Sequence, residues 1–444
     1  MIKRLSLLLF AALALVLIVS CGPGEEEDAT AESDVDYTDN PWTDGEDLSG
    51  TTVNIFGAFV DEDANRFNAA MAPFEEATGI DVVYEGSGDF ESLITVRAEG
   101  GDPPDVAAFP QPGLMQDLVE RDAVEDIGPW MEDGYLEEQY DQSWLDLASH
   151  DGIMAGVWYR ASVKSLVWYP VPEFSEAGYE IPETWDEMLD LTEQIVADGN
   201  TPWSIGIESA GATGWVATDW LEDIMLRIHP PEVYDDWVVG ELPFDSPEVR
   251  EAMGYMEEIW MNEDYVRGGT RSILTVPFGD AATPLFNDPP RAWLHRQASF
   301  IPAFFPDGAT IGEDIDYFYL PPIDEDDQGR PVLGAGDLLS AMQDRPEIRA
   351  VMRWLATGES TRGWLEQGGF VSPHNDTPLD WYPTDVDRGY AEILRDATTF
   401  RFDASDLMPG QVGTGAFWTG MVDWVNGDSL DEVLPQIDES WPED

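Results

Sequence analysis

Strand and helix patterns alternate regularly from Thr51 onward, and this alternation constrains the fold more than any other feature of the chain. Candidate strands occupy residues 53–56, 80–84 and 106–109, and apolar residues recur at helical spacing over 67–74 and 90–97. Strands that alternate with helices predict an α/β fold with a parallel, doubly wound sheet. Ligands of such folds bind beyond the carboxyl ends of the strands, so we expect a crevice near residues 57–61 and 109–111.

A second α/β unit is predicted after residue 160. The apolar stretch 165–169 has the character of a strand, and Thr184 with Glu187 forms a capping-box pattern at the start of the next helix. Residues 332–336 form an apparent return crossover between the two units. Further helices are expected at 217–227, 247–260, 346–357 and 416–425.

The N-terminus has the pattern of an export signal. Two basic residues precede an apolar run over residues 5–19, which is short for a transmembrane helix. Residues 18–21 resemble the lipobox of bacterial lipoproteins, which implies a signal peptide at 1–20 and attachment of lipid to Cys21. The alternative is an ordinary signal peptide followed by an accidental cysteine.

A flexible tether is expected after the signal peptide. Residues 21–48 are rich in Asp, Glu, Ser and Thr and lack apolar periodicity. Cys21 is the only cysteine, so no disulfide can form within the chain. Its position therefore suits an anchor better than a structural thiol.

Acidic residues dominate the charge, since 90 Asp and Glu against 21 Lys and Arg give 21 − 90 = −69. Without a basic surface to meet phosphates, the chain is not a nucleic-acid binder. Such an excess suggests a halophilic protein, whose self-repulsion is screened by salt. A solvated acidic surface that reflects a compositionally biased genome is the alternative.

The sequence carries no recognisable catalytic or cofactor motif. No two of the four histidines have zinc-motif spacing, and no nucleophile elbow, phosphate loop or dinucleotide fingerprint follows a predicted strand. Carboxylate pairs that could hydrolyse glycosides occur everywhere by chance among 90 acids. We therefore expect no metal, no cofactor and no enzymatic activity.

Tryptophans beside turn residues or polar partners indicate a carbohydrate site. Sugars present apolar C–H faces and hydroxyl rims, so their sites combine flat aromatic side chains with polar groups. For each tryptophan, packing in a core is the alternative. The candidates are Trp158, Trp215, Trp293 and Trp418, with Asp219 as a polar candidate beside Trp220.

Lys164 is the only lysine outside the export signal and stands at the predicted crossover. An ammonium has three donors and is suited to sugar hydroxyls. An ion pair between the two units is the alternative role.

Six segments resemble family 1 extracellular solute-binding proteins, the carbohydrate receptors of ABC importers. They cover most of residues 50–430 and are most similar to α-glucoside-binding members. The segments are FEEATGIDVVYEGSGDFESLITVRAEGGDPPDVAAFPQPGLMQDLVERDAVEDI, KSLVWYPVPEFSEAGYEIPETWDEM, GWVATDWLEDIMLRIHPPEVYDDWV, LFNDPPRAWLHRQASFI, GAGDLLSAM and GTGAFWTGMVDWV.

The resemblance implies a type II periplasmic-binding-protein fold, with two doubly wound α/β lobes joined by a hinge of crossing segments. Residues 49–161 and 333–375 would form lobe 1, and residues 162–332 and 376–444 would form lobe 2. Sugar would bind in the cleft between the lobes, which close about the hinge.

The resemblance also implies site residues, carried over position by position. Phe109 stands where the similar maltose-binding protein has a stacking tryptophan, and Val163 replaces an acidic sugar contact of that receptor. Asp337, just after the return crossover, is a candidate hydroxyl acceptor. Asp89, Glu91, Phe109 and Gln111 would form the wall of lobe 1, and Trp293 and Trp418 would form aromatic platforms of lobe 2.

The expected function is capture of a sugar, a di- or oligosaccharide of the α-glucoside type, by a monomeric receptor held to the membrane through lipid on Cys21. The resemblance implies delivery to ABC permease transmembrane subunits with separate ATPase subunits, in the periplasm or on the outer face of the cytoplasmic membrane. The alternatives are a secreted glycan-active hydrolase or lyase, and a binding protein for a non-sugar solute or for sensing.

Overall fold

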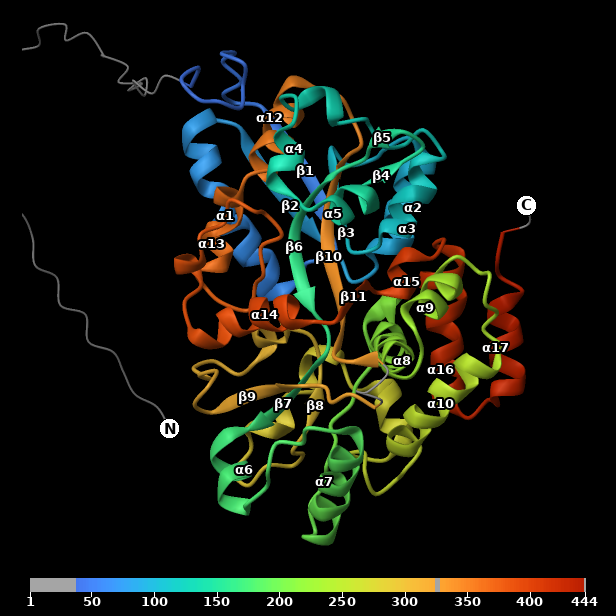
Figure 1. Cartoon of the computed structure of the whole chain (residues 1–444). Coiled ribbons are helices and arrows are strands. Elements are labelled where there is room, and N and C mark those ends of the chain that lie inside the picture. The colour runs from blue at the N-terminus through green and yellow to red at the C-terminus, as the bar shows by residue number, and fades with distance from the viewer. Residues whose placement is uncertain (1–36, 324–327, 443–444) are drawn as a thin grey trace, which may run out of the picture. The chain divides into compact units, whose positions relative to one another are not determined.

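A computed structural model describes residues 37–323 and 328–442 (Figure 1). The predicted signal peptide, Cys21 and the first part of the predicted tether lie outside these residues. The strands are β1 Thr52–Gly57, β2 Asp81–Gly86, β3 Val106–Phe109, β4 Ser149–His150, β5 Ile153–Met154, β6 Val157–Val163, β7 Leu166–Pro170, β8 His295–Arg296, β9 Ile315–Tyr319, β10 Pro331–Ala341 and β11 Thr399–Phe402. The helices are α1 Asp61–Thr78, α2 Phe90–Gly100, α3 Pro112–Val119, α4 Tyr135–Gln139, α5 Gln142–Leu147, α6 Val171–Ala177, α7 Trp185–Ala197, α8 Trp215–Ile228, α9 Pro231–Val238, α10 Pro247–Trp260, α12 Pro346–Leu355, α13 Arg362–Leu365, α14 Asp385–Asp396, α15 Ala404–Leu407, α16 Trp418–Asn426 and α17 Leu430–Asp438.

The first half of the molecule is the part built around β1, β2 and β3, the parallel strands that the sequence predicts. β1 pairs in parallel with β2 on one side and with β3 on the other. The helix α1 ends at Gly79, whose φ of 68° lies in the left-handed region that favours glycine. The starts of α1, α2 and α3 therefore follow the carboxyl ends of β1, β2 and β3, at the edge where a ligand crevice is expected.

Two long strands, β6 and β10, run side by side through the middle of the described chain and continue into the other half (Figure 1). They pair antiparallel, with Arg160 opposite Asp337, and the register shifts between Asp337 and Leu338. Side chains two positions apart on a strand share a face, so Arg160, Ser162 and Lys164 point the same way. The predicted crossover is thus a two-stranded bridge with two cations on one face.

The second half contains an antiparallel three-stranded sheet in the order β8-β7-β9 and a helical layer around α8. The helix α8 is buried along nearly its whole length and packs against α10, α16 and β10. Thr184 begins α7 as predicted, because its side chain accepts a hydrogen bond from the backbone N–H of Glu187. The strand directions of this sheet thus differ from the parallel pattern of the first half.

Separate hydrophobic cores support the two halves. One core joins β1, β2 and β3 to α1, α2, α12 and α13, and another joins α7, α8, α10, α16 and α17. A third, smaller cluster lies along β6, β7 and β9. In the described part of the chain, no helix is both long and apolar enough to cross a membrane.

The predicted tether is wrong for its last part, residues 37–48. Trp42 packs edge-on against Trp354, with ring centroids 5.0 Å apart, and also contacts Phe74. Arg353 donates hydrogen bonds to the backbone carbonyl of Trp42 at 2.9 Å and to Asp44 at 2.7 Å. A single tryptophan in an acidic segment creates no periodic pattern, which is why the sequence does not reveal that this segment packs on the first core.

Candidate functional site

A cavity of about 920 Å³, including its opening to solvent, lies over the face of β6 and β10 that carries Arg160, Ser162 and Lys164. Both halves contribute side chains. The lining includes Phe59, Asp63, Glu91 and Gln111 from the first half, and Trp215, Phe278, Phe300, Asp406 and Trp418 from the second.

Six predicted site residues meet in this cavity, although their sequence positions span more than 300 residues. Their role as sugar contacts stays a prediction. They are Glu91, Gln111, Lys164, Trp215, Asp337 and Trp418.

Three predicted aromatic contacts lie in the cores instead, and the structure corrects this part of the prediction. Phe109 is fully buried and packs edge-on against Phe90. The indole N–H of Trp158 donates to a backbone carbonyl, and Trp293 packs on Tyr179. Phe109 and Trp158 belong to the first core and Trp293 to the second, so the alternative of core packing holds for both tryptophans, and Phe109 packs in a core as well.

Asp89 and Asp219 also lie outside the cavity lining. Asp89 is exposed at the start of α2, next to Gly211, where an added Cβ would lie 2.9 Å from its Oδ1. Asp219 is fully buried on α8, behind Lys164. Asp219 therefore acts on the cavity only through the lysine.

Arg160 is a cavity residue that the sequence analysis missed. Its Nε donates to Asp337 at 2.6 Å and its Nη1 donates to Asp63 at 2.9 Å. Burial alone would lower the pKa of Arg160, but Asp337 and Asp63 hold it above its usual value. The signal in the sequence is strand alternation, because Arg160 stands four positions before Lys164 and so shares its face.

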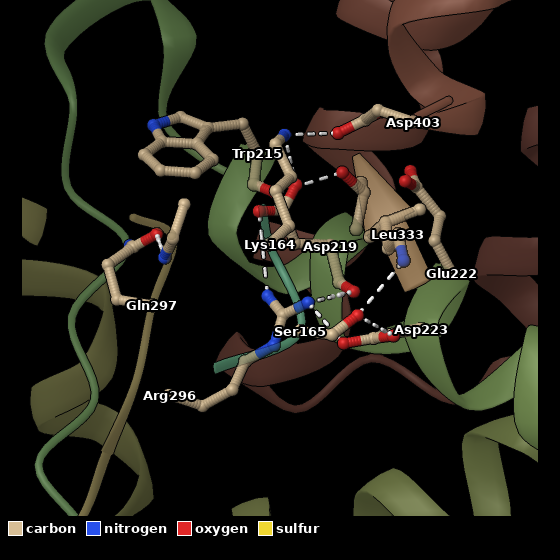
Figure 2. A network of polar contacts seen from close by, with 12 residues as sticks. Lys164, Ser165, Trp215, Asp219, Glu222, Asp223, Arg296, Gln297, Leu333 and Asp403 are labelled. Atoms are coloured by element: carbon tan, nitrogen blue, oxygen red, sulfur yellow. Dashed lines mark hydrogen bonds and ion pairs between the residues drawn. The ribbon is translucent and has the colours of Figure 1, made fainter. Parts of the chain in front are cut away.

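Lys164 lies in a buried cluster of carboxylates (Figure 2). Its Nζ donates to Asp219 at 2.8 Å and to Asp403, with Asp406 at 4.0 Å, and lies 5.3 Å from the centre of the Trp215 ring. Burial alone would lower the pKa of Lys164, but the carboxylates raise it well above its usual value. Lys164 is therefore a fixed positive charge held by the second half.

A second layer of polar contacts fixes this cluster in place. Arg296 donates to Asp223 at 2.8 Å and lies 3.5 Å from Asp219. Ser165 donates to Asp223 and accepts a hydrogen bond from the backbone N–H of Leu333 (Figure 2). These contacts connect β8, α8 and β10, so the position of Lys164 depends on all three elements.

Asp219, Glu222 and Asp403 are the only described residues grouped closely enough to suggest a metal ligand set. Their carboxylate oxygens lie within 4.8 Å of one another. The ammonium of Lys164 donates to two of these three carboxylates, so it already takes the place of a cation. Burial raises the pKa of Asp219 to about 8, which further weakens this group as a metal site.

Several helices begin at the cavity without a side-chain cap. The N-cap residues Val60 of α1, Gln111 of α3 and Gly214 of α8 accept no capping hydrogen bond. The first backbone N–H groups of a helix have no partner within it and can donate to a ligand. Gly214 has φ 123°, and a Cβ there would lie 2.4 Å from the carbonyl oxygen of Trp418, so only glycine allows α8 to start beside Trp418.

The arrangement suits a polyhydroxylated ligand. Trp215 and Trp418 supply flat apolar surfaces. Glu91 accepts a hydrogen bond from Gln111 Nε2 at 3.1 Å, while Gln111 Oε1 is buried without a hydrogen-bond partner. An unpaired buried acceptor is costly, and a ligand hydroxyl would satisfy it.

Comparison with known proteins gives consistent results. The sequence profile of the family described as bacterial extracellular solute-binding protein matches residues 53–359. The osmoprotective compounds-binding protein GgtB of Synechocystis sp. is 47% identical over 391 residues, which cover 88% of this chain and 92% of that protein. The alpha-glucosides-binding periplasmic protein AglE of Rhizobium meliloti is 44% identical over 407 residues, which cover 89% of this chain and 88% of that protein.

Among solved structures, the bacterial solute receptor AcbH matches with a TM-score of 0.76 at 16% identity. The match covers 88% of this chain and 97% of that one. At this identity the likeness shows the fold, and it confirms the predicted type II periplasmic-binding-protein fold.

Glu91 makes stability depend on pH. Burial raises its pKa from 4.5 to about 7, so between these values the folded chain holds a proton that the unfolded chain has lost. The free energy of unfolding should therefore fall as the pH rises through this window, and Glu91→Gln should remove that part of the fall. At 1.36 kcal/mol per pKa unit, we expect the free energy of unfolding of the variant to rise by about 1–3 kcal/mol relative to that of wild type between pH 4.5 and 8.

Unfolding by urea at about pH 4.5 and about pH 8 measures the change in the free energy of unfolding. Glu76→Gln, which changes an exposed carboxyl on α1, is the control and should follow wild type. A Glu91→Gln variant that also follows wild type at both pH values would refute the assignment.

Proposed function

Because the chain belongs to the bacterial extracellular solute-binding proteins, we propose that it captures an α-glucoside in the cavity between its halves and delivers it to an ABC permease. The observation that carries this proposal is the cavity itself, which combines indole faces with hydroxyl-binding groups from both halves. The name of the relative AglE, with 44% identity, supports an α-glucoside, and the name of GgtB, with 47% identity, supports an osmoprotective compound.

The proposed mechanism is a ligand-driven shift between open and closed forms. The ligand contacts both halves only in the closed form, so its differential affinity favours that form, which the permease then recognises. ATP hydrolysis belongs to separate subunits of the importer. The receptor works as a monomer and changes no covalent bond of its ligand.

Trp215 and Trp418 are the proposed stacking platforms, and Glu91, Gln111 and Asp337 the proposed hydroxyl partners. Asp337 already accepts a hydrogen bond from Arg160, which orients its carboxylate. A hydroxyl bound to such a carboxylate makes a charge-assisted hydrogen bond. Lys164 contributes positive charge beside Trp215.

Ligand binding by wild type and two tryptophan variants tests the proposal. Titration with trehalose, sucrose and α-glucosylglycerol should change tryptophan fluorescence in a saturable way for at least one of them. Trp215→Ala should weaken that binding about tenfold or more, or ~1.4 kcal/mol, because it removes a stacking face. Trp381→Ala is the control, since Trp381 lies outside the cavity lining and packs beside Arg362.

No binding of any di- or oligosaccharide would remove the carbohydrate proposal. Release of glucose from a bound glucoside during long incubation would instead favour a hydrolase, which is the alternative function.

We also propose that lipid on Cys21 holds the receptor at the outer face of the cytoplasmic membrane or in the periplasm. The support is the basic, apolar and small-residue pattern that ends at Cys21. Wild type expressed in a bacterial host should incorporate labelled fatty acid and sediment with membranes. Cys21→Ser should be unlabelled and released, and a variant that is labelled like wild type would contradict lipid attachment at this residue.

The charge of −69 supports a saline environment for the protein. Salt screens repulsion between exposed carboxylates, because the Debye length falls to about 3 Å at 1 M. The free energy of unfolding should therefore rise between about 0.1 M and 2 M NaCl. Unfolding by urea at both NaCl concentrations measures the free energy of unfolding. Equal stability at both concentrations would contradict the halophilic interpretation.

A further inference from the structure

Elements of the two halves also meet beside the cavity, where α3 contacts α15 and the turn that follows it. The helix α3 begins directly after the cavity residue Gln111 and packs in the first core. The helix α15 contributes Asp406 to the cavity, and the chain then passes through the second core to Trp418. This α3–α15 contact, made by Gly113 and Asp117 with residues 407–410, therefore joins two stretches that carry cavity residues from opposite halves.

Gly113 allows the backbones of the two halves to approach closely. A Cβ added to Gly113 would lie 2.0 Å from the carbonyl oxygen of Met408 and 2.8 Å from that of Leu407. These are backbone atoms, which cannot move aside as the end of a flexible side chain can. Gly113 lies in an α-helix and has no positive φ, so its own conformation does not require glycine, and helices favour alanine. The approach of the second half is therefore what requires a glycine at this position.

Asp117 lies one helical turn after Gly113, on the same face of α3. Its Oδ2 accepts a hydrogen bond from the backbone N–H of Gly410 at 2.9 Å. Gly410 directly precedes the helical segment Gln411–Phe417, which leads to Trp418. A side chain of the first half therefore holds the start of the segment that brings Trp418 to the cavity. Neither Gly113 nor Asp117 belongs to the cavity lining.

We propose that Gly113 and Asp117 are positioning residues for ligand binding, which allow the halves to meet at the α3–α15 contact without touching the ligand themselves. With this contact made, Gln111 of the first half and Trp418 of the second line one cavity. The inference rests on the proposed sugar-binding function and on its open and closed forms. It adds to them two residues outside the cavity on which ligand affinity depends.

The variant Gly113→Ala of the full mature chain tests the inference. Its methyl group would meet backbone oxygens of the second half and hold α3 and α15 apart. We expect calorimetric titration with trehalose, sucrose and α-glucosylglycerol to show an affinity about tenfold or more below that of wild type, because the closed form is overpacked. The free energy of unfolding without ligand, measured with urea, should not fall, because halves that separate relieve the clash and alanine favours the helix.

Two substitutions of Asp117 test the hydrogen bond to Gly410. Asp117→Ala removes the acceptor and should weaken ligand binding about threefold or more. Asp117→Asn keeps an oxygen that can accept the N–H, so its affinity should stay near that of wild type. The control is Gly100→Ala at the end of α2, where an added Cβ meets nothing within 4 Å and binding should not change.

Three results would overturn the inference. The first is a Gly113→Ala variant that binds ligand as tightly as wild type. The second is a lower free energy of unfolding for ligand-free Gly113→Ala, since the contact would then be ordinary packing within one rigid body. The third is an Asp117→Asn variant that binds as weakly as Asp117→Ala. In each case the proposed function stands, whereas wild type that binds none of the three ligands would remove the proposed function and the inference together.

Discussion

The antiparallel pairing of β6 with β10 is the constraint on which the rest of the structure depends. It joins the two halves, forms the floor of the cavity and presents Arg160 and Lys164 on one face. The first cation is held by Asp63 of the first half, and the second by Asp219 and Asp403 of the second half. The strands that join the two halves are therefore also the floor of the cavity.

Buried ion pairs of this kind are weak evidence for stability, because desolvation offsets most of the Coulomb attraction, whereas removal of one partner costs about 3–5 kcal/mol. In the second half, burial and neighbouring charges raise the pKa of Asp219, Glu222 and Asp406 together. Lys164 and Arg296 cannot neutralise all of these carboxyls, so the cluster retains protons. The cluster fixes the positions of its elements, because Lys164 at the end of β6 donates to Asp219 of α8 and to Asp403 at the start of α15, beside Trp215.

The sequence predicts the elements well because their patterns are local: the β1, β2 and β3 strands, the end of α1 at Gly79 and the start of α7 at Thr184 are as expected. It predicts site residues less well, because an aromatic residue beside a turn has the same local pattern whether it faces a core or a cavity. Trp215 and Trp158 illustrate this ambiguity, which only the packing of distant segments resolves. Asp403 caps α15 by accepting a hydrogen bond from the backbone N–H of Asp406, but nothing in this local pattern shows that α15 borders the cavity.

Negative charge thus has two separate roles in this chain, and they respond differently to salt. Many of the acidic residues that the structure describes face solvent, where ions screen them. Asp63 and Asp337 lie at 4–6% exposure in the cavity, where both accept hydrogen bonds from Arg160, and buried charges are screened much less. The acidic surface and the acidic cavity are consequences of different constraints, and the second does not follow from the first.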